Sequence, residues 1–123
     1  MARVKSRYYS ILFIGWTGAI LFLLLRKDDG DHGLLSQIPH FDKVVHFGLF
    51  FVWAALGQIS LFSRATWGRL WVVGGVFLLA LAGGSEWLQR YVEGRQADFA
   101  DFIVDVLGGV AGAYLTKYWK INQ

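Results

Sequence analysis

The sequence predicts an all-α integral membrane protein built as an antiparallel bundle of four transmembrane helices. Hydrophobic residues make up 55% of its 123 residues and charged residues only 17%, whereas a soluble domain carries about 25% charged residues. Four apolar runs follow one another along the chain, each close to the length of about 20 residues that crosses a bilayer. Because the runs show no period of two, membrane strands are the weaker interpretation.

Length and composition also limit the classes of function. A chain of this size is expected to form one integral membrane domain over residues 1–123, with the lipid bilayer as its main partner. The absence of cysteine excludes disulfides, thiol catalysis and thiolate-bound metals. The net charge of +3 is spread between apolar runs, so no nucleic-acid partner is predicted.

The first two spans are predicted at residues 8–25 and 44–63. Residues 8–25 contain no charge, and basic residues precede them as in a signal peptide. The run is too long for a signal peptide and no small-residue cleavage site follows it, so we expect an uncleaved anchor. In residues 44–63 the only ionisable side chain is His46.

The third and fourth spans are predicted at residues 70–88 and 99–119. The third is apolar until Glu86, and the fourth carries Asp101 and Asp105 in its first turns. The links between the spans are short, so neighbouring helices are expected to run antiparallel. All four predicted spans together account for most of the chain.

Basic residues predict the orientation of the bundle. The side that holds both termini carries seven Lys and Arg residues, namely Arg3, Lys5, Arg7, Arg64, Arg69, Lys117 and Lys120. The other side carries five, namely Arg26, Lys27, Lys43, Arg90 and Arg95. This excess favours cytoplasmic termini in a multi-pass protein of the inner or plasma membrane. All nine acidic residues fall on the opposite, outward side.

Polar residues collect at one depth of the predicted bundle. The start of the second span, the end of the third and the start of the fourth all lie at the outer face. Within each span these residues are spaced by three or four, which places them on one helix face. They are Asp42, Lys43 and His46; Glu86 and Gln89; and Asp98, Asp101 and Asp105. The topology therefore predicts a polar pocket that opens outward.

Purely structural roles are the alternative for these residues. Asp98 or Asp101 could cap the fourth helix, and His46 could form a hydrogen bond between helices. Several carboxylates around a histidine are a costly way to join helices in a membrane, so the functional interpretation is favoured. Gly108 and Gly112 form a GxxxG pattern, which predicts close helix packing within the chain more than a dimer face.

Three ordered motifs resemble the VanZ-like membrane protein family. They are D-K-x-x-H at 42–46, E-x-x-Q at 86–89 and G-R-x-x-x-x-x-D at 94–101. The resemblance covers about residues 41–115, so the first span lies outside it. The family often has asparagine where this chain has Asp105. Its name-giving member is associated with resistance to teicoplanin, a glycopeptide that acts at the outer cell wall, so the resemblance implies a function in the cell envelope.

The first functional hypothesis is an outward pocket that binds or acts on a cell-envelope or lipid-linked molecule. The candidate catalytic residues are His46, Glu86 and Asp101. His46 would be a general acid or base oriented by Asp42 or Asp101, and Glu86 a second acid or base. Arg95 would hold a phosphate or carboxylate. The remaining candidate binding residues are Asp42, Lys43, Gln89, Asp98 and Asp105.

The same residues are compatible with other functions. The polar residues could lock the helices of a non-catalytic accessory or assembly subunit that docks to a larger membrane complex. A metal site is a further alternative, because carboxylates with one histidine are a hard or borderline ligand set. His32 and His40 could join such a site from the outer link. Since no HExxH or comparable spacing is present, no metal or cofactor is predicted. Transport is the least favoured function.

Overall fold

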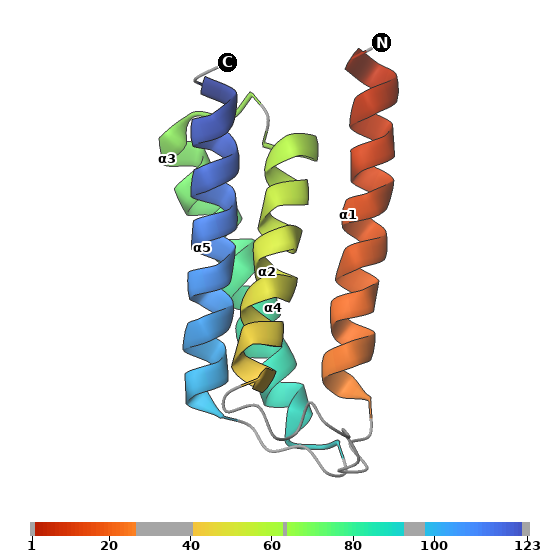
Figure 1. The fold of residues 1–123 in the computed structure, drawn as a ribbon, viewed down its shortest axis with the longest axis vertical. Coiled ribbons are helices and arrows are strands. Elements are labelled where there is room, and N and C mark those ends of the chain that lie inside the picture. Colours follow the sequence, from red (N-terminus) through yellow and green to blue (C-terminus); the bar gives the residue numbers. More distant parts are fainter. Residues whose placement is uncertain (1, 27–40, 63, 93–97, 122–123) are drawn as a thin grey trace.

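The computed structural model describes residues 2–26, 41–62, 64–92 and 98–121. The described residues form helices and short connections, and no strand occurs among them. The elements are α1 (Ala2–Leu25), α2 (Phe41–Ser60), α3 (Trp67–Arg69), η2 (Leu70–Gly74), α4 (Gly75–Gln89) and α5 (Phe99–Ile121). Both termini lie at the same end of the bundle, and successive long helices run antiparallel (Figure 1). The all-α prediction is confirmed.

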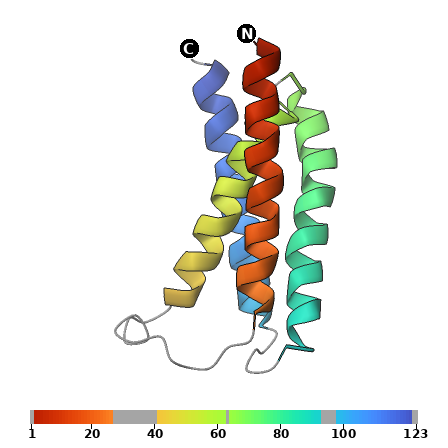
Figure 2. The same ribbon diagram turned by 90° about the vertical axis from the view of Figure 1, so that its right-hand side faces the viewer.

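Four helical segments are long and apolar enough to cross a membrane. They are Arg7–Leu25, Phe41–Ser60, Trp67–Gln89 and Phe99–Trp119. The four long segments lie side by side along one axis, as the two perpendicular views show (Figure 2). The prediction of four helices of membrane-spanning length and composition is therefore confirmed.

Two spans begin earlier than the apolar runs suggest. α2 starts at Phe41 rather than at residue 44, and it ends at Ser60 rather than at residue 63. Asp42 lies in its first turn, where the positive end of the helix dipole favours a carboxylate. The third span starts at Trp67 instead of residue 70, because the Thr66 side chain accepts a hydrogen bond from the Arg69 N–H at 3.2 Å. The charged residues Asp42 and Arg69 therefore lie in the first turns of these two spans and not in the links before them.

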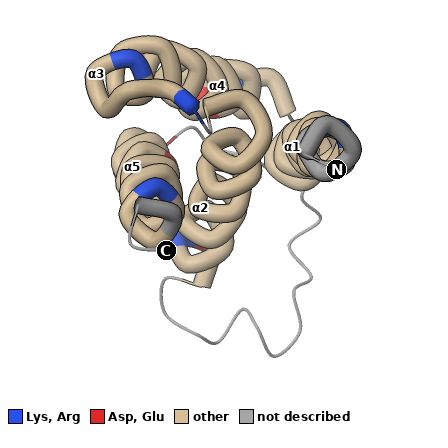
Figure 3. Tube along the Cα trace, turned by 90° about the horizontal axis from the view of Figure 1, so that it is seen from above, with Lys and Arg blue, Asp and Glu red and all other residues tan. Residues whose placement is uncertain are grey.

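α2 is the central helix of the bundle. Seen from the end that holds the termini, it lies between α1 and α5, with α4 alongside (Figure 3). Its most extensive interface is with α5. The buried apolar core is contributed by α1, α2 and α4, through Ile20, Leu24, Leu49, Phe50, Trp53, Ala54, Leu78 and Ala82. Large apolar side chains also cover the outer surface, as expected for helices that face lipid.

The α2–α5 interface depends on two glycines. A Cβ atom on Gly108 would collide with the Phe47 carbonyl oxygen, and one on Gly112 would collide with the Phe51 carbonyl oxygen. The backbones of the two helices therefore approach more closely than any larger residue would allow. The predicted role of this GxxxG pattern, close packing within the chain, is confirmed.

Polar contacts attach α1 to the other helices. The Trp16 indole N–H donates to the Leu49 carbonyl at 2.9 Å, and the Trp53 indole N–H donates to the Thr17 hydroxyl at 2.9 Å. Near the other end of α1, the Gln89 amide donates to the Leu24 carbonyl at 3.0 Å. Side-chain hydrogen bonds of this kind hold helices together where the hydrophobic effect is absent.

The third span is not a uniform α-helix. Leu70–Gly74 form a π-helical turn, η2, and the Gly75 N–H lies within reach of the carbonyls of Trp71 and Val72. Such wide turns are rare inside helices and often lie near functional sites. The apolar run at residues 70–88 predicts a span but not its irregularity, since a continuous apolar run carries no signal for the extra residue in a π-helical turn.

Candidate functional site

Polar residues from three helices meet at the end of the bundle away from the termini. We call this group the polar cluster: Lys43 and His46 of α2, Glu86 of α4, and Asp98, Asp101 and Asp105 at the start of α5. Topology brings them together because α2 and α5 start, and α4 ends, at this end of the bundle (Figure 1).

His46 and Asp105 form the most buried contact of the polar cluster. The His46 Nδ1 lies 2.7 Å from the Asp105 Oδ1, and the two residues are 4% and 0% exposed. When Asp105 is ionised, its carboxylate can only accept, so Nδ1 is then the donor. Asp105 is therefore the hydrogen-bond partner of His46 in the structure, whereas the Asp42 side chain is 65% exposed and Asp101 lies 3.8 Å from Nε2.

Lys43 covers the outer side of the polar cluster. Its ammonium lies 2.7 Å from the Asp101 carboxylate, 3.2 Å from that of Asp98 and 3.7 Å from that of Asp42. The Asp101 side chain is mostly buried, whereas those of Asp98 and Asp42 are exposed. The Lys43–Asp101 ion pair is therefore better shielded from solvent than the pairs with Asp98 and Asp42, and it joins α2 to α5.

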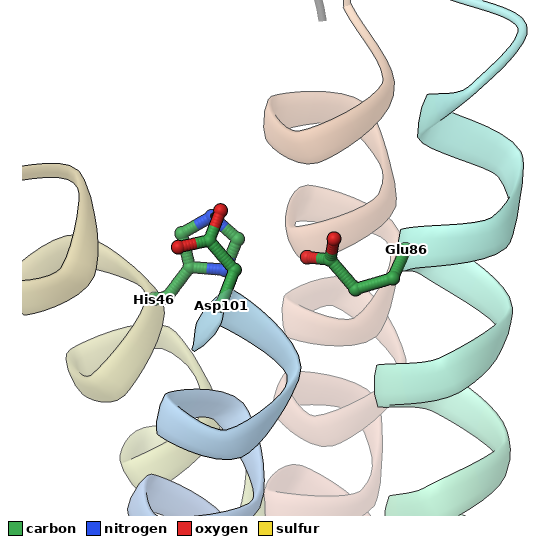
Figure 4. Close-up of side chains that lie close together, drawn as sticks. All are labelled: His46, Glu86 and Asp101. Atoms are coloured by element: carbon green, nitrogen blue, oxygen red, sulfur yellow. Dashed lines mark ion pairs between the residues drawn. The ribbon is translucent and has the colours of Figure 1, made fainter. Parts of the chain in front are cut away.

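Glu86 turns its carboxylate toward His46 and Asp101 (Figure 4). The Glu86 Oε2 accepts a hydrogen bond from the Asp98 backbone N–H at 3.1 Å. Its Oε1 is buried and has no hydrogen-bond partner among the described residues, and the same is true of the Asp105 Oδ2. Glu86 itself is 7% exposed. The interior of the polar cluster therefore contains acceptor atoms that meet no donor from the described residues.

Asp98 is the residue that caps α5. Its Oδ1 accepts a hydrogen bond from the Ala100 N–H at 2.9 Å, and its carbonyl accepts one from the Asp101 N–H at 3.0 Å. The Ala100 N–H, followed by the Lys43 ammonium, holds the pKa of the Asp98 carboxyl below its ordinary value. Of the two capping candidates, Asp98 takes the structural role, and Asp101 points into the polar cluster.

Gln89, another candidate residue, contacts a different helix. The Gln89 amide nitrogen binds the Leu24 carbonyl, and its Oε1 is buried without a partner among the described residues. Gln89 therefore links α4 to α1. Arg95 lies outside the described residues, as do His32 and His40.

A separate apolar cavity lies deeper in the bundle and was not predicted. It has a volume of about 450 Å³ and is bordered by α1, α2, η2, α4 and α5, within the range of about 300–1,000 Å³ that is usual for ligand pockets. Trp53, Leu78 and Ala113 are among its apolar lining residues, and Gln58 is a polar one. The buried Gln58 Oε1 has no partner in the described part of the chain. A glutamine inside an apolar span was the one available signal.

A known protein family matches nearly the whole chain. The sequence model of the VanZ/LLP1 family matches residues 3–120. The chain belongs to the VanZ/LLP1 family. The match takes in the first helix, to which the three motifs do not extend. Neither a curated protein nor a solved structure matches the chain. With four helices of spanning length, this VanZ/LLP1 protein is a multi-pass membrane protein in contact with the lipid bilayer.

Proposed function

We propose that this VanZ/LLP1 protein lies in the cell membrane with its polar cluster outward and binds a lipid-linked molecule of the cell envelope there. The observation that carries the proposal is the buried His46–Asp105 pair beside a Glu86 oxygen that has no partner among the described residues. Buried ionisable groups are costly in a membrane protein and commonly mark a functional site. Acceptor atoms without donors suit a ligand that brings its own hydroxyl, amide or cation.

The apolar cavity supports an amphiphilic ligand. Ala54, which lines the cavity, follows His46 by eight residues on α2, a distance of about 12 Å along a helix. In this proposal, one lipid would place its polar group beside His46 and its chain in the cavity. An apolar chain suits walls that are almost entirely hydrocarbon and aromatic.

The residues of the polar cluster would then have distinct roles. His46, oriented by Asp105, is the general acid or base for a reaction of the polar group, and Glu86 is the second acid or base. Lys43 and Arg95 are the cationic groups for a phosphate or carboxylate. A role in glycopeptide resistance, which the family resemblance implies, belongs to the same proposal. Its cellular readout is the teicoplanin susceptibility of cells that carry the wild type or the Glu86→Gln variant.

A second candidate function is that of an assembly or accessory subunit. It is favoured by contacts that join three helices through the polar cluster: Lys43 with Asp101, His46 with Asp105, and Glu86 with the Asp98 backbone. On this alternative the cluster is structural, and the apolar outer surface docks to a larger membrane complex.

Thermal unfolding of the Glu86→Gln variant in detergent separates the two functions. The substitution removes a buried negative charge but keeps an oxygen that can accept from the Asp98 N–H. If the cluster is retained for a ligand, the variant melts at or above the wild-type temperature, because functional sites are often kept at a cost to stability. Melting well below the wild type would favour the assembly function. Asp42→Asn is the matched control, and Arg95→Ala and Asp101→Asn complete the series.

Binding of a polyprenyl phosphate in nanodiscs tests the lipid part of the proposal. A Cβ atom on Gly75 would meet no other atom within 4 Å, and Gly75 lines the cavity. Gly75→Leu therefore occupies part of the cavity, and we expect it to weaken lipid binding without lowering the melting temperature. The uncharged polyprenol is the control for the polar group. Equal binding by the wild type and Gly75→Leu would contradict a role for the cavity.

A further inference from the structure

We propose that His46, Glu86 and Asp101 form a binding site for a divalent transition-metal cation, with zinc as the first candidate. One ligand atom from each residue lies within 4.8 Å of the other two, and all three residues are buried. The three side chains converge from α2, α4 and α5 (Figure 4). No local spacing in the sequence predicts such a site, because each residue comes from a different helix.

The donor set matches this class of ion. One imidazole nitrogen and two carboxylates are ligands for zinc and related first-row metals. In a tetrahedral zinc site with bonds of about 2.0–2.2 Å, neighbouring ligand atoms are roughly 3.4 Å apart. The ligand atoms therefore have to draw together on binding. Glu86 has the longest and most flexible of the three side chains, so it is the ligand that can move.

The Glu86 Oε1 is the second, independent indication of a ligand. Glu86 is more than nine-tenths buried, and its Oε1 meets no hydrogen-bond donor in the described part of the chain. The carboxylate is turned toward His46 and Asp101 (Figure 4). A buried carboxylate oxygen without a donor is unfavourable, and a bound cation would satisfy it.

The His46–Asp105 hydrogen bond prepares His46 to bind a metal. Metal-binding histidines usually donate their second ring N–H to a carboxylate or carbonyl, which fixes the tautomer and the ring orientation. The Asp105 Oδ1, at 2.7 Å from Nδ1, is such a partner. In the neutral ring the lone pair then lies on Nε2, the nitrogen that faces Asp101.

The charge of the buried residues also suits a divalent cation. When ionised, the carboxylates of Glu86, Asp101 and Asp105 carry three negative charges, and the partly buried Lys43 ammonium carries one positive charge. Their sum is therefore −2 with His46 neutral. Lys43 binds the Asp101 Oδ1, while the Oδ2 faces His46, so Asp101 can bind both cations at once. A divalent cation would neutralise the group.

Metal titration of the purified protein tests the site. The wild type is stripped with a chelator in detergent, dialysed and titrated with zinc chloride, and in parallel with manganese chloride, by calorimetry. Metal content is measured after gel filtration. We expect one metal per chain and a melting temperature that rises with metal concentration until the site is full.

The variants separate the proposed site from surface binding. Glu86→Gln should lose at least about tenfold in metal affinity, and Asp105→Asn about 10–100-fold, as is typical when a partner of a metal-binding histidine changes. Asp42→Asn should lose far less affinity than Glu86→Gln, because Asp42 is exposed and is not one of the three proposed ligands. Absence of saturable binding by the wild type at millimolar metal would overturn the proposal. Equal losses in Asp42→Asn and Glu86→Gln would also overturn it.

The metal site goes beyond the proposed function and does not depend on it. With a cation on Nε2 and Asp105 on Nδ1, His46 would hold the ion instead of transferring a proton. No lipid is present in the titration, so a negative result leaves lipid binding to be judged by the nanodisc experiment. Loss of polyprenyl phosphate binding in the Gly75→Leu variant leaves the metal site unaffected, because Gly75 lines the cavity and contributes no ligand.

Discussion

Asp105 determines how the buried histidine is presented. Its carboxylate has no exposed surface, and one oxygen binds the His46 Nδ1 while the other has no partner among the described residues. The family that the sequence resembles often has asparagine at this position. An asparagine oxygen can also accept from Nδ1, so the orientation of the ring is preserved while the negative charge is lost.

Replacement of Asp105 tests this role at the level of one residue. Asp105→Ala removes the acceptor of the His46 Nδ1–H, and we expect the free energy of unfolding to fall by about 1–3 kcal/mol. Asp105→Asn should fall by less, because its amide oxygen keeps the hydrogen bond. Chemical unfolding in detergent measures both. Equal losses in the two variants would show that charge, rather than the hydrogen bond, holds His46.

At the scale of helices, the close approach of α2 and α5 determines which polar residues meet. The glycines at 108 and 112 let the backbones touch, so His46 and Lys43 lie directly against Asp105 and Asp101. A wider separation would pull these pairs apart, since ion pairs and hydrogen bonds need contact distances. The glycine pattern and the polar cluster are therefore coupled.

Gly112→Ala measures this coupling. A methyl group there collides with the Phe51 carbonyl, and overpacking of this kind lowers stability by about 1–3 kcal/mol. Gly15→Ala on α1 is the control, because a Cβ atom at Gly15 meets nothing within 4 Å. We expect that control to unfold like the wild type or at a higher temperature. A stable Gly112→Ala would mean that α2 and α5 can separate without loss.

The sequence predicts the helices and the meeting of the polar residues, but not how these residues pair. Uninterrupted apolar runs determine the number of spans, and short links determine which ends lie together. Spacing along one helix places Asp101 and Asp105 on one face, yet it does not define the rotation of that face relative to α2. The partner of His46 is therefore visible only in three dimensions. The same holds for the cavity, which depends on how five elements pack.

At the scale of the whole molecule, the two ends of the bundle differ in chemistry. The acidic polar cluster is at one end, while at the other the Lys117 ammonium donates to the Ala65 carbonyl at 2.6 Å and lies 5.1 Å from the centre of the Trp67 ring. The excess of basic residues on the side of the termini predicts that this end faces the cytoplasm. The polar cluster would then face outward.

Cysteine labelling in intact cells tests the orientation. The chain contains no cysteine, so single substitutions can be read without background. Tyr91→Cys lies at the end of the bundle that carries the polar cluster, and it should react with a membrane-impermeant maleimide. Leu61→Cys lies near the opposite end of the bundle, and it should react only after the cells are opened. Both positions are well exposed. The reverse pattern would place the termini outside and contradict an outward polar cluster.

The π-helical turn η2 determines how far α4 is rotated about its axis relative to the start of the third span. Each residue of a helix advances it by about 100°, and the wide turn at Leu70–Gly74 contains more residues per turn than the helix that follows. Deleting one residue from it would therefore rotate Glu86 by about a quarter of a revolution relative to Trp67. The length of this turn aligns the carboxylate at one end of the span with His46 and Asp101, while the residues at the other end still border the cavity.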